Sequence, residues 1–177
     1  MPTDPTSIDV LLSPKMTLVV DIFRALGDCE ASYDVAVIDT LEHRLTGATD
    51  GQTARAVVSD ALLLGFALRN QRTDAGSPHP GWEMNAVGAR RASVHECATL
   101  ALIAASKAGE TPLATRAARQ LAVALNPTVS SLARDMGVRL EGAGLRVQSR
   151  DWAPLIEVYS ARPPHEDRDG RRSAVRS

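Results

Sequence analysis

The chain of 177 residues is long enough to form one domain that buries a core without disulfide or metal support. Its 20 basic and 21 acidic residues nearly cancel, and Trp, Tyr and Phe each occur only twice. These counts exclude the strong positive field and the broad aromatic surface that nucleic-acid binding uses. No apolar run approaches the ~20 residues of a membrane span, and the acidic N-terminus is unlike a signal peptide, so we expect a cytoplasmic protein without nucleic-acid or membrane partners.

The distribution of proline predicts long helices. Two long windows contain none, between Pro14 and Pro78 and between Pro80 and Pro112. Both are rich in Ala, Leu, Val, Arg and Glu, whereas proline would break a helix interior. The sequence therefore predicts an all-α fold. Its expected parts are an N-terminal arm over residues 1–12, a helical bundle domain over 13–160 and a disordered, Arg-rich tail over 161–177.

The first predicted helix starts at Ser13, an N-cap followed by Pro14, and runs to about Thr46. Its apolar residues recur at three-and-four spacing, which makes one inward stripe. The stripe comprises Val19, Phe23, Leu26, Tyr33, Val37 and Leu41. Many neighbouring residues are β-branched, so an α/β fold with strands over 16–23 and 33–41 is the alternative.

Three further helices are predicted, over residues 50–71, 82–108 and 111–136. Thr49 and Gln52 form a capping-box pattern at the start of the second, and a Pro- and Gly-rich loop over 73–81 separates it from the third. Pro127 should kink the fourth or split it in two. Residues 145–160 are expected to form a short strand pair or an apposed peptide. Two hairpins joined by a longer link predict a four-helix bundle.

Three side chains are candidate metal ligands. Glu30 occupies a core-facing position in the first predicted helix, and a buried carboxylate requires a partner. His95 and Glu96 lie at the edge of the inward face of the third. Helical bundles build di-metal sites from a Glu on each of two helices and Glu-x-x-His on the other two, so Glu30 and Glu96 could supply the lone glutamates.

The other ligands of such a site are missing from the second and fourth predicted helices. The alternative is that Glu30 and Glu96 are solvated or pair on helix surfaces with a basic residue, namely Arg24, Arg90 or Arg91. Cys29 and Cys97 fit no metal-ligand spacing and are predicted to be small buried thiols.

Two stretches carry a family resemblance. Residues 92–109, ASVHECATLALIAASKAG, and residues 23–49 resemble the third and first helices of ferritin-like proteins, in particular the YciE/YciF-type bacterial stress proteins. The resemblance covers residues 15–136 and implies a ferritin-like four-helix bundle with iron, held in part by Glu30, His95 and Glu96. The family's other acidic stretches correspond here to VVSDALLLG and QLAVALNPT, which lack its Glu and His residues.

The leading functional hypothesis is therefore a non-catalytic or metal-degenerate ferritin-like bundle without a cofactor, acting in stress response as a binding or regulatory protein. Because alanine-rich helices with few aromatics can complete their core through a partner bundle, we expect a homodimer, with a further protein partner possible. One alternative is a ferritin-like iron protein of oxidase or peroxidase type with an incomplete carboxylate/His site. Another is a small helical adaptor that uses its Arg-rich tail: Arg168, Arg171, Arg172 and Arg176.

Overall fold

The computed structural model describes residues 10–32, 36–72 and 82–161, and of residues 29–32 it describes the backbone alone. These residues are 73% helical, which confirms the all-α prediction. They form seven helices: α1 (Pro14–Ser32), α2 (Ala36–Thr46), α3 (Gly51–Asn70), α4 (Val94–Ala108), α5 (Thr111–Gln120), α6 (Pro127–Gly142) and α7 (Ser149–Ser160). Most of the expected disordered tail and most of the N-terminal arm lie outside the described residues.

Two short strands close the N-terminal end of the domain. β1 (Val10–Leu11) pairs antiparallel with β2 (Arg91–Ala92), so that Val10 lies opposite Ala92 and Leu11 opposite Arg91. The strands predicted under the α/β alternative are absent from the described part of residues 16–41, which lies in α1 and α2. That alternative is wrong because residues 19–26 of α1 are buried on all sides of the helix, and the β-branched Val19, Val20 and Ile22 pack within this buried part.

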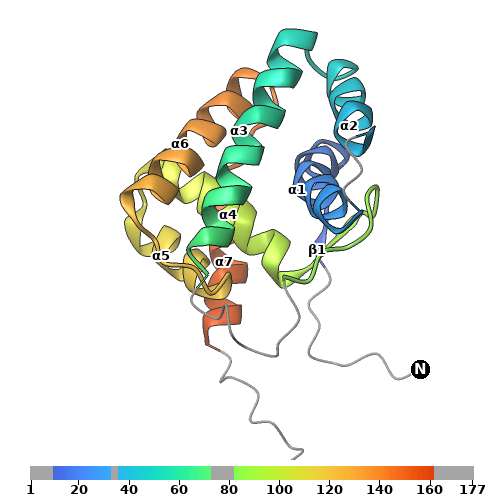
Figure 1. Cartoon of the computed structure of the whole chain (residues 1–177). Coiled ribbons are helices and arrows are strands. Elements are labelled where there is room, and N and C mark those ends of the chain that lie inside the picture. The colour runs from blue at the N-terminus through green and yellow to red at the C-terminus, as the bar shows by residue number, and fades with distance from the viewer. Residues whose placement is uncertain (1–9, 33–35, 73–81, 162–177) are drawn as a thin grey trace, which may run out of the picture.

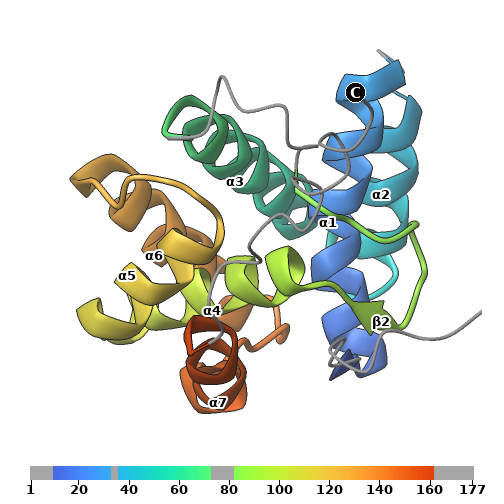
Figure 2. The same cartoon turned by 90° about the horizontal axis from the view of Figure 1, so that it is seen from below.

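The centre of the domain is α4, which contacts α5, α6 and α7. Figures 1 and 2 show α3 between α6 and the α1/α2 pair, and α3 contacts all three of these helices. Every residue of α4 from Glu96 to Ala105 is buried. A helix that is buried on all sides requires small or apolar residues around its whole circumference, and the alanines of α4 meet that requirement.

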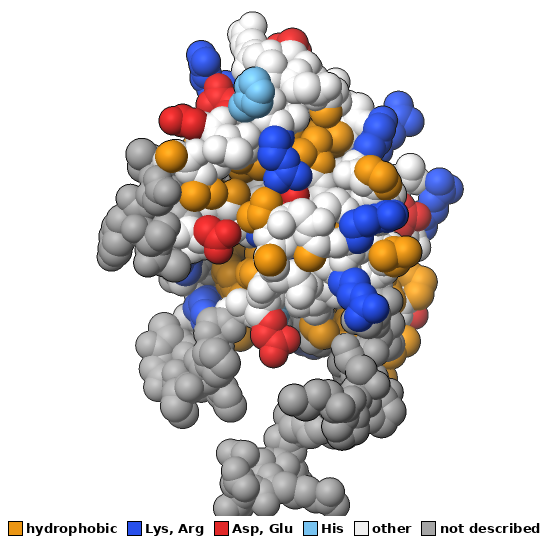
Figure 3. Space-filling view, turned by 90° about the vertical axis from the view of Figure 1, so that its right-hand side faces the viewer, with side chains coloured by type: hydrophobic (Ala, Val, Ile, Leu, Met, Phe, Trp, Pro, Cys, Tyr) orange, Lys and Arg blue, Asp and Glu red, His pale blue; other side chains and the backbone are white. Residues whose placement is uncertain are grey.

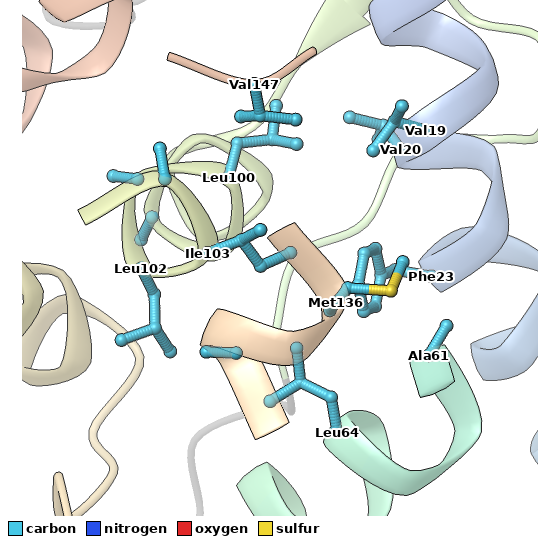
Figure 4. Close-up of a cluster of buried hydrophobic side chains, with 14 of the residues drawn as sticks. Val19, Val20, Phe23, Ala61, Leu64, Leu100, Leu102, Ile103, Met136 and Val147 are labelled. Carbon is cyan, nitrogen blue, oxygen red and sulfur yellow. The ribbon is translucent and has the colours of Figure 1, made fainter. Parts of the chain in front are cut away.

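Hydrophobic side chains from four helices meet beside α4. Figure 4 shows Phe23 of α1, Leu64 of α3, Ile103 of α4 and Met136 of α6 pointing into one cluster. A close helix contact lies at the next residue of α6, Gly137. A Cβ atom added there would lie 2.9 Å from Lys107 Cβ and 3.2 Å from the Ile103 carbonyl oxygen, so glycine lets α6 approach α4.

The single long helix predicted over residues 13–46 is wrong. Helix α1 ends at Ser32, and α2 starts at Ala36 and packs back against α1. Residues 33–35, between the two helices in the chain, lie outside the described residues. The predicted helix over 50–71 is confirmed as α3, although its N-cap is Asp50 and not Thr49. The Asp50 carboxylate accepts hydrogen bonds from the Thr53 amide and hydroxyl.

The predicted helix over 82–108 starts twelve residues late, at Val94. Ser93 and Glu96 form a capping box: the Ser93 hydroxyl accepts from the Glu96 amide, and the Glu96 carboxylate accepts from the Ser93 amide. This motif fixes the helix start. The preceding residues 82–90 contain no helix, and Gly88 has a left-handed conformation with φ of 86°.

The fourth predicted helix is split at Pro127, as expected. Helix α5 ends at Gln120, Asn126 caps α6, and Pro127 occupies its first turn. The expectation of a strand pair or apposed peptide over 145–160 is wrong, because residues 149–160 form α7. Its residues Trp152, Ile156 and Tyr159 are buried at helical spacing. Seven helices therefore stand where four were predicted. Within the described residues, no helix is long and apolar enough to cross a membrane.

Candidate functional site

The candidate ligand Glu96 lies in the first turn of α4 with its side chain fully buried. Its Oε1 atom accepts from Arg24 Nε at 2.7 Å and from the Asn85 amide at 2.9 Å. Its Oε2 atom accepts from Arg24 Nη2 at 3.0 Å, Asn85 Nδ2 at 3.1 Å and the Ser93 amide at 2.8 Å. Both carboxylate oxygens are therefore occupied by donors from three separate segments of the chain.

The partner of Glu96 is Arg24 of α1, whose guanidinium is also fully buried. Beyond its two bonds to Glu96, Arg24 Nη1 donates to Asp21 Oδ1 at 3.1 Å and to the Ala89 carbonyl at 2.6 Å. Its Nη2 donates to the Arg91 carbonyl at 2.7 Å. A guanidinium has five N–H donors, and here all five have an acceptor. The bidentate pairing with Glu96 also fixes the plane of the group.

Asp21 and Arg44 complete the group. Asp21 is buried one turn before Arg24 and accepts from the Gly88 amide at 2.8 Å. Its second oxygen accepts from Arg44 Nη2 of α2 at 2.7 Å. We call Asp21, Arg24, Arg44 and Glu96 the ion cluster. It contains two positive and two negative groups and therefore has no net charge. Its ion pairs and hydrogen bonds join α1, α2, α4 and the segment that precedes α4.

The ion cluster shifts the pKa of two of its members, Glu96 and Arg24. Burial alone would raise the pKa of Glu96, but the hydrogen bonds from Arg24, Ser93 and Asn85 outweigh burial and lower it. Burial opposes the charge of Arg24 too, yet the bonds to Glu96 and Asp21 raise its pKa. Both groups are therefore ionised at neutral pH. These shifts come from saturated structural pairing, which leaves neither group as a proton donor or acceptor for a substrate.

The other two candidate ligands do not join Glu96. His95 Nδ1 accepts from the Glu83 amide at 3.0 Å, so this nitrogen is not available to a metal ion. The backbone of Glu30 lies in α1, six residues beyond Arg24, and its side chain lies outside the described residues. Among the side chains that the structure describes, no three His, Cys, Asp or Glu lie close enough together to hold a metal ion.

The residues around Glu96 do not fit iron. A metal ligand needs a free lone pair directed at a vacant position, whereas both oxygens of Glu96 accept bonds from nitrogen donors. The alternative in which Glu96 pairs with Arg24 is the one that the structure contains. The pair is buried, however, and not on a helix surface as the sequence had suggested.

Sequence reasoning missed Asp21, Arg44 and Asn85 as partners in the ion cluster. One signal was present: Asp21 and Arg24 are separated by three residues and stand in an otherwise apolar stretch of α1. Two opposite charges on the inward face of a helix indicate a buried pair that needs further partners.

The neighbouring thiol is inert, because burial, aided by the charge of Glu96, raises the pKa of Cys97 to about 12. The prediction of a buried free thiol is confirmed for Cys97, and the Cys29 side chain lies outside the described residues.

The face that carries α1 and α2 shows hydrophobic side chains between basic ones (Figure 3). A shallow groove of about 340 Å³ between these helices is lined by Val37, Leu41, Arg44 and their neighbours. Arg44 is the basic residue of this groove and is bound to Asp21 of the ion cluster. The guanidinium of Arg44 in this groove is therefore already used in an ion pair that joins α2 to α1.

The outer face of α3 exposes three large hydrophobic side chains. Leu62 is 42% exposed, Leu63 53% and Phe66 66%. They lie within five residues of one another and opposite the buried face of the helix, which contains Ala54, Val57, Ala61, Leu64 and Leu68. Such a concentration is unusual for a surface that faces only water, where single exposed hydrophobics are the rule. We call Leu62, Leu63 and Phe66 the α3 row.

Comparisons with known proteins find no matching family model, no matching curated protein and no matching solved structure.

Proposed function

We propose that this chain is a non-catalytic helical binding protein that works as a homodimer and associates through the α3 row. The observation that carries the proposal is the exposure of Leu62, Leu63 and Phe66 on one helix face. The ion cluster supports the non-catalytic part, because its buried charges are bound to one another and to the backbone. A catalytic acid or base would instead keep a proton or a lone pair available to a substrate.

A second copy fits the α3 row because the row is self-complementary. In a two-fold dimer the same patch faces itself, and when the two-fold axis is perpendicular to α3 the two α3 helices cross in antiparallel orientation. Centred between Leu63 and Phe66, this arrangement sets Leu63 against the partner's Phe66 and Ser59 against the partner's Asn70. The apolar centre is thereby covered and its ends are polar, which is the usual anatomy of a protein interface.

Such an interface extends beyond three side chains. A stable interface buries about 800 Å² on each partner, so the exposed polar residues of α3 around the row form its rim. Arg55 lies toward the N-terminal end of the same face and is paired with Glu42 of α2 at 2.7 Å. That ion pair draws the charge of Arg55 toward α2 and leaves the apolar part of α3 as the centre of contact.

We further propose that the bundle has a ferritin-like origin and a role in stress response or regulation. In di-metal bundles the inward carboxylates are neutralised by metal ions. Here the guanidinium groups of Arg24 and Arg44 would supply that positive charge to Asp21 and Glu96. A metal-degenerate bundle of this kind would keep its fold without iron.

The test is the mass of the protein in solution, measured by sedimentation equilibrium over a range of concentrations. The wild type should approach twice the chain mass of 18.9 kDa. Phe66→Glu should sediment as a monomer with unchanged helical circular dichroism. Val158→Glu is the matched control, since Val158 is 45% exposed on α7, and it should remain a dimer. A wild type that stays monomeric at all concentrations contradicts the proposal.

Elemental analysis separates the proposal from the iron-protein alternative. Protein purified from iron-supplemented cells should contain no stoichiometric iron, because Glu96 is bound to Arg24. Near-stoichiometric iron that is lost in Glu96→Ala would favour the oxidase or peroxidase alternative instead. Circular dichroism of the variant, recorded alongside, shows whether the loss of metal reflects a lost ligand or an unfolded chain.

A further inference from the structure

One hollow of the domain is lined by residues that belong neither to the ion cluster nor to the α3 row. It has a volume of about 530 Å³ and is formed where the end of α4 meets the first turns of α5 and α6. Pockets that bind small molecules commonly range from about 300 to 1,000 Å³. The hollow, which we call the α4–α6 pocket, is therefore of a size that suits a small metabolite.

Hydroxyl and basic groups line the α4–α6 pocket. The polar side chains are Ser106, Lys107, Thr111, Ser130, Ser131 and Arg134, and the described lining contains no Asp or Glu. Hydroxyl groups and cations are the side chains that bind phosphate oxygens. Ala105, Ala114 and Leu125 add an apolar part to the wall, which could contact the body of a ligand.

Several of these side chains have hydrogen-bond donors that other residues of the pocket do not use. The Ser106 hydroxyl oxygen is buried and makes no hydrogen bond in the structure. Lys107 Nζ donates to Glu141 Oε2 at 2.9 Å, which uses one of its three hydrogens. Arg134 lies 3.5 Å from its sequence neighbour Asp135, and both side chains are more than half exposed, so this contact is weak. An anion in the pocket would satisfy donors that the fold does not use.

We propose that the α4–α6 pocket binds a small molecule that carries a phosphate group and hydroxyl groups. Arg134 and Lys107 would hold the phosphate, with the hydroxyls of Ser106 and Ser130 as further donors. The apolar wall and the remaining hydroxyl groups would contact the rest of the molecule. This site is separate from the α3 row, so it gives the binding protein a ligand whether or not the chain dimerises.

The test is a titration of the labelled protein with ribose 5-phosphate, followed by amide NMR spectra. The expected result is a saturable set of shifts at residues 106–114 and 128–134. Inorganic phosphate should shift the same amides more weakly, and ribose alone should leave them unchanged. Saturable shifts with ribose but not with phosphate would overturn the assignment of the anion site, and no saturable shifts with any probe would overturn the whole inference.

Two variants and a matched control locate the phosphate group. Arg134→Gln should weaken ribose 5-phosphate binding about tenfold, and Ser106→Ala should weaken it by a smaller factor, as expected for a charge-assisted and a neutral hydrogen bond. Arg90→Gln should bind as the wild type does, because Arg90 is exposed in the segment before β2, where it donates to the Leu12 carbonyl, and this segment does not line the pocket. Equal effects of Arg134→Gln and Arg90→Gln would show nonspecific attraction and contradict the site.

Discussion

Glu96 in the first turn of α4 and the residues in the middle of the helix are equally buried and are held in different ways. In the first turn, the carboxylate of Glu96 has five hydrogen bonds to named donors. In the middle, residues 100–105 contact other helices through apolar groups alone. In a buried ion pair, the loss of one member leaves the other charge without a partner. In apolar packing, the stabilising free energy is spread over many weak contacts. Depth of burial therefore does not indicate how a substitution will act.

The largest effect is expected from Arg24→Met. The change removes the guanidinium that is bound to Glu96 and leaves Glu96 and Asp21 buried without that charge. Breaking a buried ion pair from one side costs about 3–5 kcal/mol, so urea unfolding should show a loss of this size. Arg55→Met is the control, because Arg55 is exposed and its pairing with Glu42 is worth less than about 1 kcal/mol. Equal losses in the two variants would show that the ion cluster has no special weight.

A somewhat smaller loss is expected from Leu100→Ala in the middle of α4. Leu100 is fully buried, and its truncation leaves a cavity among the apolar side chains around it. Such changes cost about 2–5 kcal/mol, depending on how far the surroundings relax. Val138→Ala, at an exposed position of α6, should change the free energy of unfolding by less than about 0.5 kcal/mol. If Leu100→Ala were as mild as that, the middle of α4 would not be closely packed.

Gly137→Ala tests the close crossing of α4 and α6. The added methyl would contact Lys107 Cβ and the Ile103 carbonyl oxygen at distances that force the helices apart. Overpacking of this kind costs about 1–3 kcal/mol, measurable as a lower midpoint of thermal unfolding. Gly27→Ala is the matched helical control, because nothing lies within 4 Å of its added Cβ. It should stabilise the protein by about 0.5–1 kcal/mol, and a stabilising Gly137→Ala would refute the close crossing.

The smallest effect is the contribution of Glu96 to acid sensitivity. Its pKa is lowered in the folded state, so its ionised form stabilises the fold above its unfolded pKa of about 4.3. That stabilisation is lost as the pH falls below this value and through the folded pKa. Between pH 6 and 3, urea unfolding of the wild type should therefore lose stability more steeply than that of Glu96→Gln. Parallel curves would show that Glu96 does not titrate with the fold.

The sequence predicted a helix best where the periodic spacing of apolar residues and the capping residues indicated the same boundaries. Helix α3 was predicted to within one residue at each end, because its stripe is continuous and Asp50 stands beside its start. Helix α4 began later than predicted because the absence of proline was taken as evidence of helix. The Ser93–Glu96 capping box and Gly88 mark the true boundary in the sequence itself.

Helix α7 could not be predicted from propensity, because Pro154 lies inside it. Burial of Trp152, Ile156 and Tyr159 outweighs the lost backbone hydrogen bond, and only the finished core shows how much area these residues bury. The ion cluster was hidden for a similar reason. The charges at Asp21 and Arg24 could be recognised as inward-facing, but their partners Arg44 and Glu96 lie 23 and 72 residues away along the chain.

That long separation has a kinetic consequence. The bond between Arg24 and Glu96 closes a loop of 72 residues, and loop closure on this scale must precede the gain in free energy from the contact. We therefore expect the ion cluster to form late in folding, after local helices are in place. Contacts absent from the folding transition state act mainly on the unfolding rate, so we expect the guanidinium of Arg24 to affect how long the domain stays folded more than how quickly it folds.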